Sequence, residues 1–576
     1  MSDDPDALLD ALDDQQRLAA ESLLGPVCVL AGAGTGKTRA ITHRIAYGVR
    51  TGAYAPERVM ALTFTTRAAA ELRGRLRTLG AAGVATRTFH AAALAQLNYF
   101  WPLVVGGSAP QVLDGKARVL GQAAERLRIR VDTATLRDLA ADIELRKVSG
   151  QSIDQHAARL TSRGAPGALT VEQALDLHAG YERAKDEARR IDFEDVLLAT
   201  AGMIEHEASV ALHVREQYRF FVVDEYQDVS PAQQRLLDLW LGDRSEVCVV
   251  GDASQTIYSF AGARPDYLLG FESRYPDATV LRLEHNYRSL PPIVDVANRL
   301  MRGRPGALAL TSERTEQGAP KPVVREHPTD VAEARQVAQR VLELIEAGEQ
   351  PESIAVLYRV NAQSAVLERA LDEVGVSSRL RGARRFFDQP EVKQAVQALR
   401  AASLTIADEP LFKSVSDVMR SLGWSQSPPE GPGAVRDRWE AYNALVRLVD
   451  DVPDGTTFRR FTDDLLERAA AQHEPTVSAV TLATLHSAKG LEWDTVFLVG
   501  LSEGLLPISY ASGLEQVDEE RRLLYVGITR ARRRLEVSWS ERGGHSRSVR
   551  APSRFLREIG TRNPDATAPA RGAVRR

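Results

Sequence analysis

Residues 26–38 decide the fold, and they read Pro26-Val27-Cys28-Val29-Leu30-Ala31-Gly32-Ala33-Gly34-Thr35-Gly36-Lys37-Thr38. A short apolar run leads into a glycine-rich turn and then into an amphipathic stretch, which predicts a strand, a loop and a helix. The loop nearly fits the phosphate-binding pattern G-x-x-x-x-G-K-[ST], with Ala31 at the position of the first glycine. Glycines let backbone N–H groups curl around phosphate oxygens, and the helix that follows directs its positive dipole end at the anion.

This loop predicts ATP and Mg²⁺ as cofactors. Its backbone, over Ala31, Gly32, Ala33, Gly34, Thr35 and Gly36, would cradle the phosphates. Lys37 would add a positive charge at the β- and γ-phosphates, and the hydroxyl of Thr38 would be a ligand of Mg²⁺. The alternative is a glycine-rich turn that matches by chance, and the flanking strand and helix argue against it.

A second apolar strand ends in acidic residues. Phe220–Val223 runs into Asp224-Glu225-Tyr226-Gln227-Asp228. The carboxyl ends of parallel strands are where open α/β sheets bind their ligands, so we expect both carboxylates beside the phosphate loop. Asp224 would hold Mg²⁺, and Glu225 would orient or deprotonate the attacking water. A lone Asp-Glu pair would more simply be a solvated loop, and only the phosphate loop changes that reading.

Further strand-length apolar runs occur along the chain, each followed by a helix-like stretch; they are Val59–Thr63, Val247–Val250, Ile354–Tyr358 and Thr495–Val499. This alternation predicts an α/β fold with parallel strands. Residues 91–190 and 389–476 instead have an almost wholly helical pattern, with a loop at 427–433. The sequence therefore predicts two α/β units, each interrupted by a helical insertion.

The composition limits the class of protein. The chain has 576 residues, of which 44% are hydrophobic and 26% charged, so wholesale disorder is excluded. Two cysteines, Cys28 and Cys248, are too few for a disulfide framework or a four-cysteine zinc site, and they suit a reducing compartment. We expect neither a secretory signal nor a membrane span. The formal net charge of −4 conceals a basic end, because residues 531–576 hold twelve arginines against four acidic residues.

Several strings, in order, resemble the motifs of UvrD/Rep/PcrA-type superfamily 1A DNA helicases. The acidic string 224–228 is similar to their motif II. The others are Leu12–Arg17 (Q motif), Ala61–Ala69 (Ia), Thr88–His90 (Ib), Asp192–Asp195, Val250–Tyr258 (III), Leu283–Ser289 (IV), Ala355–Ser364 with Arg385–Phe387 (IVa), Thr484–Glu492 (V) and Glu519–Ala531 (VI). The ordered set spans about residues 10–560 and is highly specific, whereas one string alone would not be.

The resemblance implies roles around ATP. Arg288 and Arg530 match the arginine fingers that reach from the second core domain to the γ-phosphate, and Gln255 matches a γ-phosphate sensor. The resemblance also implies that Gln16 reads the adenine edge, Tyr287 stacks on its ring, Arg39 covers the other face and Glu492 meets the ribose. A surface ion pair with Glu284 or Glu520 is the alternative for either arginine.

The resemblance also implies contacts with single-stranded DNA. Phe64, Tyr258 and Phe260 match positions that stack on bases, for which core packing is the alternative. The expected backbone contacts are Thr63, Arg67, Thr88, His90, Arg359, Asn361 and His486. A histidine is by itself more often a structural hydrogen-bonding residue, and His90 and His486 gain weight only from their motifs.

The sequence departs from the family pattern at three places. Phe260-Ala261 replaces the usual Trp-Arg, and His285 stands where Gln is usual. The insertion after Phe387 has fewer than a hundred residues, which is shorter than the family's mobile 2B subdomain. We expect a short actinobacterial-like member, either a natural short form or a truncation, in which strand separation is affected more than ATP hydrolysis.

The resemblance implies two RecA-like P-loop cores. We expect the first core (1A) over 1–90 and 191–279, and a helical insertion (1B) over 91–190. The second core (2A) is expected over 280–388 and 477–560, with a reduced insertion (2B) over 389–476 and a disordered basic tail over 561–576.

The expected function is that of a 3′→5′ single-stranded-DNA translocase and DNA helicase, with hydrolysis in the cleft between the cores and a role in DNA repair or replication. The expected partners are single-stranded DNA, 3′-tailed duplex DNA and a repair protein, for a monomer or weak dimer in the cytoplasm at the nucleoid. One alternative is a translocase that displaces proteins and unwinds poorly without a partner. Another is a non-catalytic DNA-binding adaptor, against which the intact ATP motifs argue.

Overall fold

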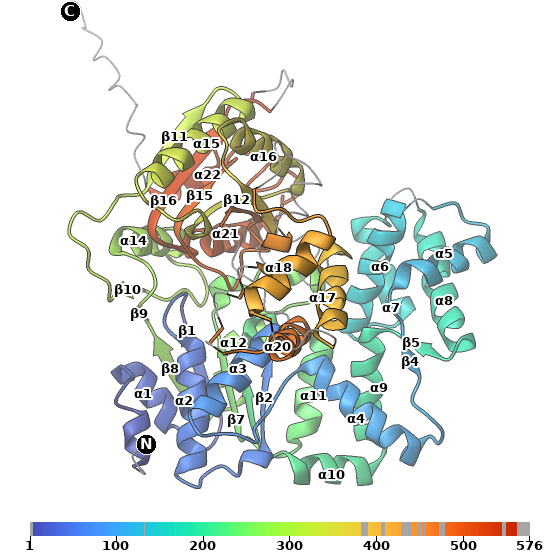
Figure 1. Ribbon diagram of the computed structural model, residues 1–576. Helices are drawn as coiled ribbons and strands as arrows, with labels where there is room; N and C mark the ends of the chain where they lie inside the picture. Colours follow the sequence, from blue (N-terminus) through green and yellow to red (C-terminus); the bar gives the residue numbers. More distant parts are fainter. Residues whose placement is uncertain are drawn as a thin grey trace, which may run out of the picture. The chain divides into compact units, whose positions relative to one another are not determined.

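The computed structural model describes residues 4–131, 133–166, 169–381, 390–404, 409–427, 441–471 (except 444, 447, 450, 451 and 454), 478–543 and 549–560. The chain forms two compact units (Figure 1). The first unit comprises Met1–His285 and Gly303–Leu310, and the second comprises Asn286–Arg302 and Thr311–Arg576. The segments expected at 385–387 and 561–576 lie outside the described residues.

The first unit contains a parallel sheet with the strand order β3-β2-β6-β7-β1-β8. Its strands are β1 (Val27–Ala31), β2 (Val59–Thr63), β3 (Ala85–Thr88), β6 (Phe220–Val223), β7 (Val247–Gly251) and β8 (Thr279–Leu283). The four apolar runs predicted in this part of the chain are strands, and the continuous burial of β2, β6 and β7 explains why their sequences do not alternate between apolar and polar residues. The boundary predicted at 279/280 is wrong, because β8 pairs with β1 and extends the first sheet to Leu283.

Two hydrophobic clusters in this unit pack against opposite sets of sheet residues. Trp240 is fully buried, its ring stacks on Phe89 and Phe221 at centroid distances of 6.0 Å, and its indole donates to Gln96. The helices are α1 (Asp14–Glu21), α2 (Lys37–Arg50), α3 (Thr66–Thr78), α4 (Phe89–Val104), α9 (Phe193–His206), α10 (Ala208–Gln217), α11 (Pro231–Leu241), α12 (Asp266–Leu269) and α13 (Phe271–Arg274).

The predicted helical insertion has its own small core. Its helices are α5 (Lys116–Leu127), α6 (Thr133–Val148), α7 (Ile153–Arg163) and α8 (Val171–Glu187). Two short strands, β4 (Gln111–Val112) and β5 (Arg190–Ile191), pair in parallel where the chain enters and leaves the insertion. The wholly helical reading of 91–190 therefore missed this pair, because two-residue strands carry no periodic signal.

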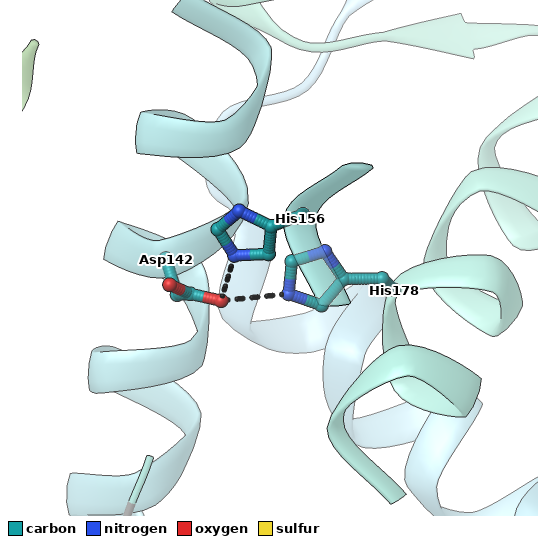
Figure 2. Close-up of side chains that lie close together, drawn as sticks. All are labelled: Asp142, His156 and His178. Carbon is teal, nitrogen blue, oxygen red and sulfur yellow. Dashed lines mark hydrogen bonds and ion pairs between the residues drawn. The ribbon is translucent and has the colours of Figure 1, made fainter. Parts of the chain in front are cut away.

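Three helices of the insertion meet at a buried polar cluster. Figure 2 shows Asp142 of α6, His156 of α7 and His178 of α8, with both imidazole Nε2 atoms on one carboxylate oxygen at 2.8 and 3.1 Å. Arg146 Nε donates to Nδ1 of His178 at 3.1 Å, so the neutral ring carries its hydrogen on Nε2 and donates it to Asp142. Burial lowers the pKa of His178. The shared carboxylate therefore links helices α6, α7 and α8 through hydrogen bonds.

A second buried network joins the insertion to α9. Asp192 caps α9 by accepting from the backbone N–H of Asp195 at 2.9 Å. Its carboxylate also accepts from Lys147 Nζ at 2.7 Å, from Lys185 Nζ at 3.2 Å and from the hydroxyl of Tyr181 at 2.9 Å. Although burial opposes ionisation, the two lysines hold the pKa of Asp192 far below its usual range. Both lysines and Asp192 are buried, so each charge depends on its partners.

The second unit contains another parallel sheet, with the order β11-β16-β15-β12-β14-β13. Its strands are β11 (Val323–His327), β12 (Ile354–Tyr358), β13 (Ser378–Arg381), β14 (Val480–Thr484), β15 (Trp493–Leu498) and β16 (Ala531–Ser540). The short strands β9 (His285–Asn286) and β10 (Thr311–Ser312) form a separate pair. The helices beside the main sheet are α14 (Pro291–Met301), α15 (Asp330–Glu346), α16 (Ser364–Glu373), α21 (Leu514–Ile528) and α22 (Arg554–Ile559). Both predicted strands of this unit are present.

The second insertion is helical where the structure describes it. It contains α17 (Pro390–Ser403), α18 (Leu411–Ser421) and α20 (Phe458–Ala471), whose apolar residues share one cluster. The predicted limits at 388/389 and 476/477 lie at least partly outside the described residues and remain predictions. Among the described residues, no helix combines the length and the apolar character that a membrane crossing requires.

We predict that Asp192→Asn lowers the free energy of unfolding by about 1–3 kcal/mol, because Lys147 and Lys185 lose one buried carboxylate while Glu182 and Asp195 still pair with them. Asparagine keeps a side-chain oxygen that can cap α9, so the measured loss of stability reports the removed charge and not a lost helix cap. Urea unfolding followed by circular dichroism would measure it. Asp176→Asn, at an exposed position of α8, is the matched control and should change stability by less than about 0.5 kcal/mol. Equal stability of the two variants would contradict the prediction.

Candidate nucleotide and nucleic-acid sites

The phosphate loop lies between β1 and α2, as predicted. Gly34 and Gly36 have φ values of 74° and 79°, in the left-handed region that favours glycine. Gly36 is the N-cap of α2 and no side chain caps this helix end. Thr35 closes the loop by donating from Oγ1 to the carbonyl of Gly32 at 2.9 Å. Ala31 is not among the residues with positive φ, so this position does not require the glycine of the usual pattern.

Gln16 and Arg39 form hydrogen bonds that connect the N-terminal segment with the phosphate loop and α2. Gln16 is buried, and its Nε2 donates to the carbonyl of Thr35 at 3.0 Å. Asp13 caps α1 and accepts from the backbone N–H of Gln16 at 2.8 Å. Arg39 donates from Nη2 to the carbonyl of Ala11 at 2.5 Å. The structure thus ties the segment before α1 and α1 itself to the phosphate loop, while contact of Gln16 and Arg39 with adenine stays a prediction.

The two acidic residues lie where β6 ends, two strands from β1 in the sheet. Burial and the neighbouring Glu225 raise the pKa of Asp224 to about 7, and Lys37 opposes the shift. Lys37 Nζ lies 3.5 Å from Glu225 Oε1. Glu225 has a φ of 53°, which is uncommon for a residue other than glycine and costs about 1–3 kcal/mol. The strained backbone therefore holds this carboxylate beside Lys37.

A chain of hydrogen bonds connects Glu225 to Gln255. Gln227 is buried; its Nε2 donates to Glu225 Oε2 at 2.5 Å and its Oε1 accepts from the backbone N–H of Asp252 at 3.0 Å. Asp252 in turn accepts from Gln255 Nε2 at 2.7 Å. Gln227 and Asp252 belong to two of the sequence motifs, but the motifs alone assign a role to neither. Gln227 and Asp252 lie close together because the strands that precede them, β6 and β7, are neighbours in the sheet.

Three aromatic rings form a row in the first unit. Phe64 follows β2, and its ring stacks on Tyr258 at a centroid distance of 5.7 Å and an interplanar angle of 12°. Tyr258 meets Phe260 edge-on at 6.0 Å. Phe64 is 42% and Phe260 is 61% exposed, so the core-packing reading is wrong for both. The row offers ring faces to a flat ligand.

The expected backbone contacts of this unit have different environments. Thr63 is buried, whereas Arg67 is exposed in the first turn of α3. Thr88 caps α4 by accepting from the backbone N–H of Ala91 at 3.1 Å. His90 lies partly buried beside Phe193, and burial together with Lys116 lowers its pKa to about 4. At neutral pH this imidazole can therefore serve as a hydrogen-bonding group and not as a cation.

The second unit brings together residues of motifs IV, V and VI. Arg288 Nε lies 2.5 Å from Glu492 Oε2, and its Nη1 donates to the carbonyl of Thr529 at 3.3 Å. Although burial opposes it, Arg288 and Arg532 lower the pKa of Glu492. Arg288 therefore pairs with Glu492 and not with Glu284, the partner in the alternative interpretation. Tyr287 is 44% exposed, in keeping with a ring open to a ligand.

Arg530 is buried, which contradicts the surface ion-pair reading. Its guanidinium donates to the carbonyls of Val526 and Leu491 at 2.9 and 3.0 Å. These bonds hold the side chain between α21 and Leu491, which lies two residues before β15. Arg288 contacts Glu492 and the carbonyl of Thr529, and Arg530 contacts the carbonyl of Leu491. The two arginines therefore bind to the same pair of segments, 491–492 and 529–530.

Arg359, Asn361 and His486 gather near the ends of β12 and β14. Arg359 is 12% exposed, and its guanidinium donates to Glu520 at 2.8–3.2 Å and to the hydroxyl of Tyr510 at 3.4 Å. Burial, with Arg359 and Lys489, lowers the pKa of His486 to about 4. Asn361 is exposed. From the sequence, Glu520 is expected only as an alternative partner of Arg288 or Arg530, and no motif indicates Tyr510.

Comparisons with known proteins agree with this geometry. The family model for the UvrD/REP helicase N-terminal domain matches residues 12–276, and that for the UvrD-like helicase C-terminal domain matches 281–427 and 411–542. The chain is 48% identical to ATP-dependent DNA helicase UvrD2 of Mycobacterium tuberculosis over 97% of this chain and 83% of that protein. It is 30% identical to DNA helicase II of Escherichia coli, over 96% of this chain and 88% of that protein.

Identity to ATP-dependent DNA helicase PcrA of Staphylococcus epidermidis is 27%, over 96% of this chain and 87% of that protein. The two family models together cover most of the chain, and two of these relatives reach 30% identity or more over nearly its whole length. The motifs quoted from the sequence fall within the matched ranges or directly beside them. The chain therefore belongs to the UvrD/REP helicase family.

Proposed function

We propose that this chain is a single-stranded-DNA-stimulated ATPase that moves 3′→5′ along one strand and unwinds duplex DNA. One observation carries the proposal: the phosphate loop, the Asp224-Glu225 pair, Gln255 and the exposed aromatic row all lie at or just beyond the carboxyl ends of strands of one parallel sheet. This edge is where open α/β sheets bind ligands. The names of the relatives, ATP-dependent DNA helicases, support the same activity.

The first unit provides the groups that ATP hydrolysis needs. Thr38 and Asp224 offer hard oxygen donors of the kind that Mg²⁺ prefers, and the raised pKa of buried Asp224 marks a carboxylate that a cation would stabilise. Bound there, Mg²⁺ would neutralise charge on the phosphates. Lys37 would bind the β- and γ-phosphates, and Glu225 would accept a proton from the attacking water.

Gln255 is the proposed γ-phosphate sensor, because its hydrogen bond to Asp252 connects it through Gln227 to Glu225. Arg288 and Arg530 are the proposed arginine fingers. Each is held by partners within the second unit, which is the preorganisation that electrostatic stabilisation requires. Adenine contacts by Gln16, Arg39 and Tyr287, and a ribose contact by Glu492, complete the proposal.

The aromatic row would stack on bases of a single strand without sequence preference. Arg67, which is exposed, is the proposed phosphate contact with the simplest access. Thr63, Thr88, His90, Asn361 and His486 are proposed as hydrogen-bonding contacts. Arg359 has its guanidinium bound to Glu520, so its share in phosphate binding would be small.

A second candidate is a translocase that displaces proteins and unwinds poorly without a partner. Phe260-Ala261 favours it, because the ring is smaller than the usual Trp and the adjacent cation is absent. A non-catalytic adaptor is disfavoured by the intact phosphate loop and by the strained Glu225. We propose action in the cytoplasm at the nucleoid, as a monomer or weak dimer, with a repair protein as partner.

We predict faster ATP turnover with single-stranded DNA, and unwinding of a 3′-tailed but not a 5′-tailed duplex. The reason is that 3′→5′ movement on the tail leads into the duplex only from a 3′ tail. Phosphate release and strand separation would be measured together on duplexes of identical sequence. ATP turnover that is unchanged by single-stranded DNA would contradict both the helicase and the translocase candidates. ATP turnover that DNA stimulates without strand separation would favour the second candidate.

Glu225→Gln should bind ATP and single-stranded DNA as the wild type does and lose at least about a hundredfold in turnover. Glutamine is nearly isosteric but cannot accept the proton from water. A fluorescent ATP analogue would report binding, and phosphate release would report turnover. Glu216→Gln, at an exposed position of α10, is the control; turnover retained in Glu225→Gln would remove Glu225 as the base.

Phe260→Ala should weaken binding of oligo-dT about tenfold, because one stacked base contributes about 1–3 kcal/mol. Fluorescence anisotropy of a labelled oligonucleotide would measure the affinity. Tyr99→Ala removes another exposed ring, on α4, and should bind oligo-dT unchanged. If both variants keep wild-type affinity, the row is not a stacking platform.

A further inference from the structure

The segment 504–513, between motifs V and VI, presents an exposed ring on an ordered backbone. Tyr510 is 69% exposed, although most large aromatic residues are at least partly buried. The backbone around it is tied down: Ser509 N–H donates to Gly504 at 3.1 Å, and Ala511 N–H donates to Ile508 at 2.9 Å. Leu506 is buried beneath. The ring is therefore held out from the surface by its own loop.

Two contacts orient this segment toward the expected DNA contacts of the second unit. The backbone N–H of Ile508 donates to Glu520 Oε2 at 3.1 Å, and the hydroxyl of Tyr510 accepts from Arg359 Nη2 at 3.4 Å. Glu520 is the same carboxylate that binds Arg359. Arg359 and His486 follow the neighbouring strands β12 and β14, in which Tyr358 pairs with Thr484, so both residues lie at the same sheet edge.

Arg359 and His486, two of the expected contacts, contribute little positive charge here. The guanidinium of Arg359 is paired with Glu520 and is mostly buried, and the low pKa of His486 leaves that ring neutral at pH 7. A strand that crosses here would gain little from ion pairs with these two residues. An exposed ring at the same place can instead bind any base through its face.

We propose that Tyr510 stacks on a base of the bound single strand and is a further DNA-binding residue of this protein. The inference rests on the proposed function. Tyr510 would then be a stacking ring of the second unit, as Phe64, Tyr258 and Phe260 are proposed to be in the first unit.

Three variants of the full chain test this with a 2-aminopurine-labelled oligo-dT. Tyr510→Ala should weaken binding about tenfold and reduce the change in 2-aminopurine fluorescence, whereas Tyr510→Phe should stay within about twofold of the wild type. Leu514→Ala, which is 89% exposed in the next helix, is the matched control without a ring. Equal affinity of Tyr510→Ala and wild type would overturn the inference.

Salt dependence separates stacking from charge. Stacking releases no counterions, so Tyr510→Ala should keep the wild-type slope of log affinity against log salt. A Tyr510→Phe variant as weak as Tyr510→Ala would show that the hydroxyl matters and would overturn the stacking role.

Photocrosslinking of wild-type protein to 5-iodouracil-substituted DNA provides a measurement without substitution, and absence of a Tyr510 adduct alongside adducts to the first unit would also overturn it. If wild-type protein binds no single-stranded DNA, the proposed function fails first, and this outcome is distinguishable from the others.

Discussion

The burial of negative charge at one sheet edge is the constraint on which the rest of the first unit depends. The order β6-β7-β1 puts Asp224 and Asp252 at the ends of neighbouring strands, with the phosphate loop at the end of the third. Burial raises the pKa of both carboxyl groups. Carboxylates held in this way need cations and donors around them. Lys37 lowers the pKa of both groups, the backbone N–H of Glu225 donates to Asp224, and Gln255 donates to Asp252.

Much of the fold could be predicted because continuous burial leaves a simple mark on the sequence. Strands such as β6 and β12 are apolar without interruption, and Gly34 and Gly36 of the phosphate loop have the positive φ values that favour glycine. The candidate site residues were predictable only as strings, since a motif gives the order of side chains and not their partners. The comparisons support the family that those strings indicated.

The partners could not be predicted because they come from distant parts of the chain. Nothing near Arg359 in the sequence indicates that Glu520 takes up its guanidinium, and nothing near Arg288 indicates Glu492. The boundary at 279/280 was wrong for a related reason: only pairing with β1 decides to which sheet β8 belongs. The positive φ of Glu225 likewise has no local signal, because the surrounding structure imposes it.

Gln227 has one consequence for how the active edge can change. Its amide donates to Glu225 with one end and accepts from the backbone of Asp252 with the other. Rotation of the planar amide would move both of its hydrogen-bonding ends together. The bond to the backbone of Asp252 therefore helps to orient the amide that donates to Glu225. One buried side chain thus connects the carboxylate after β6 with the backbone after β7, so the position of the second segment bears on the orientation of the first.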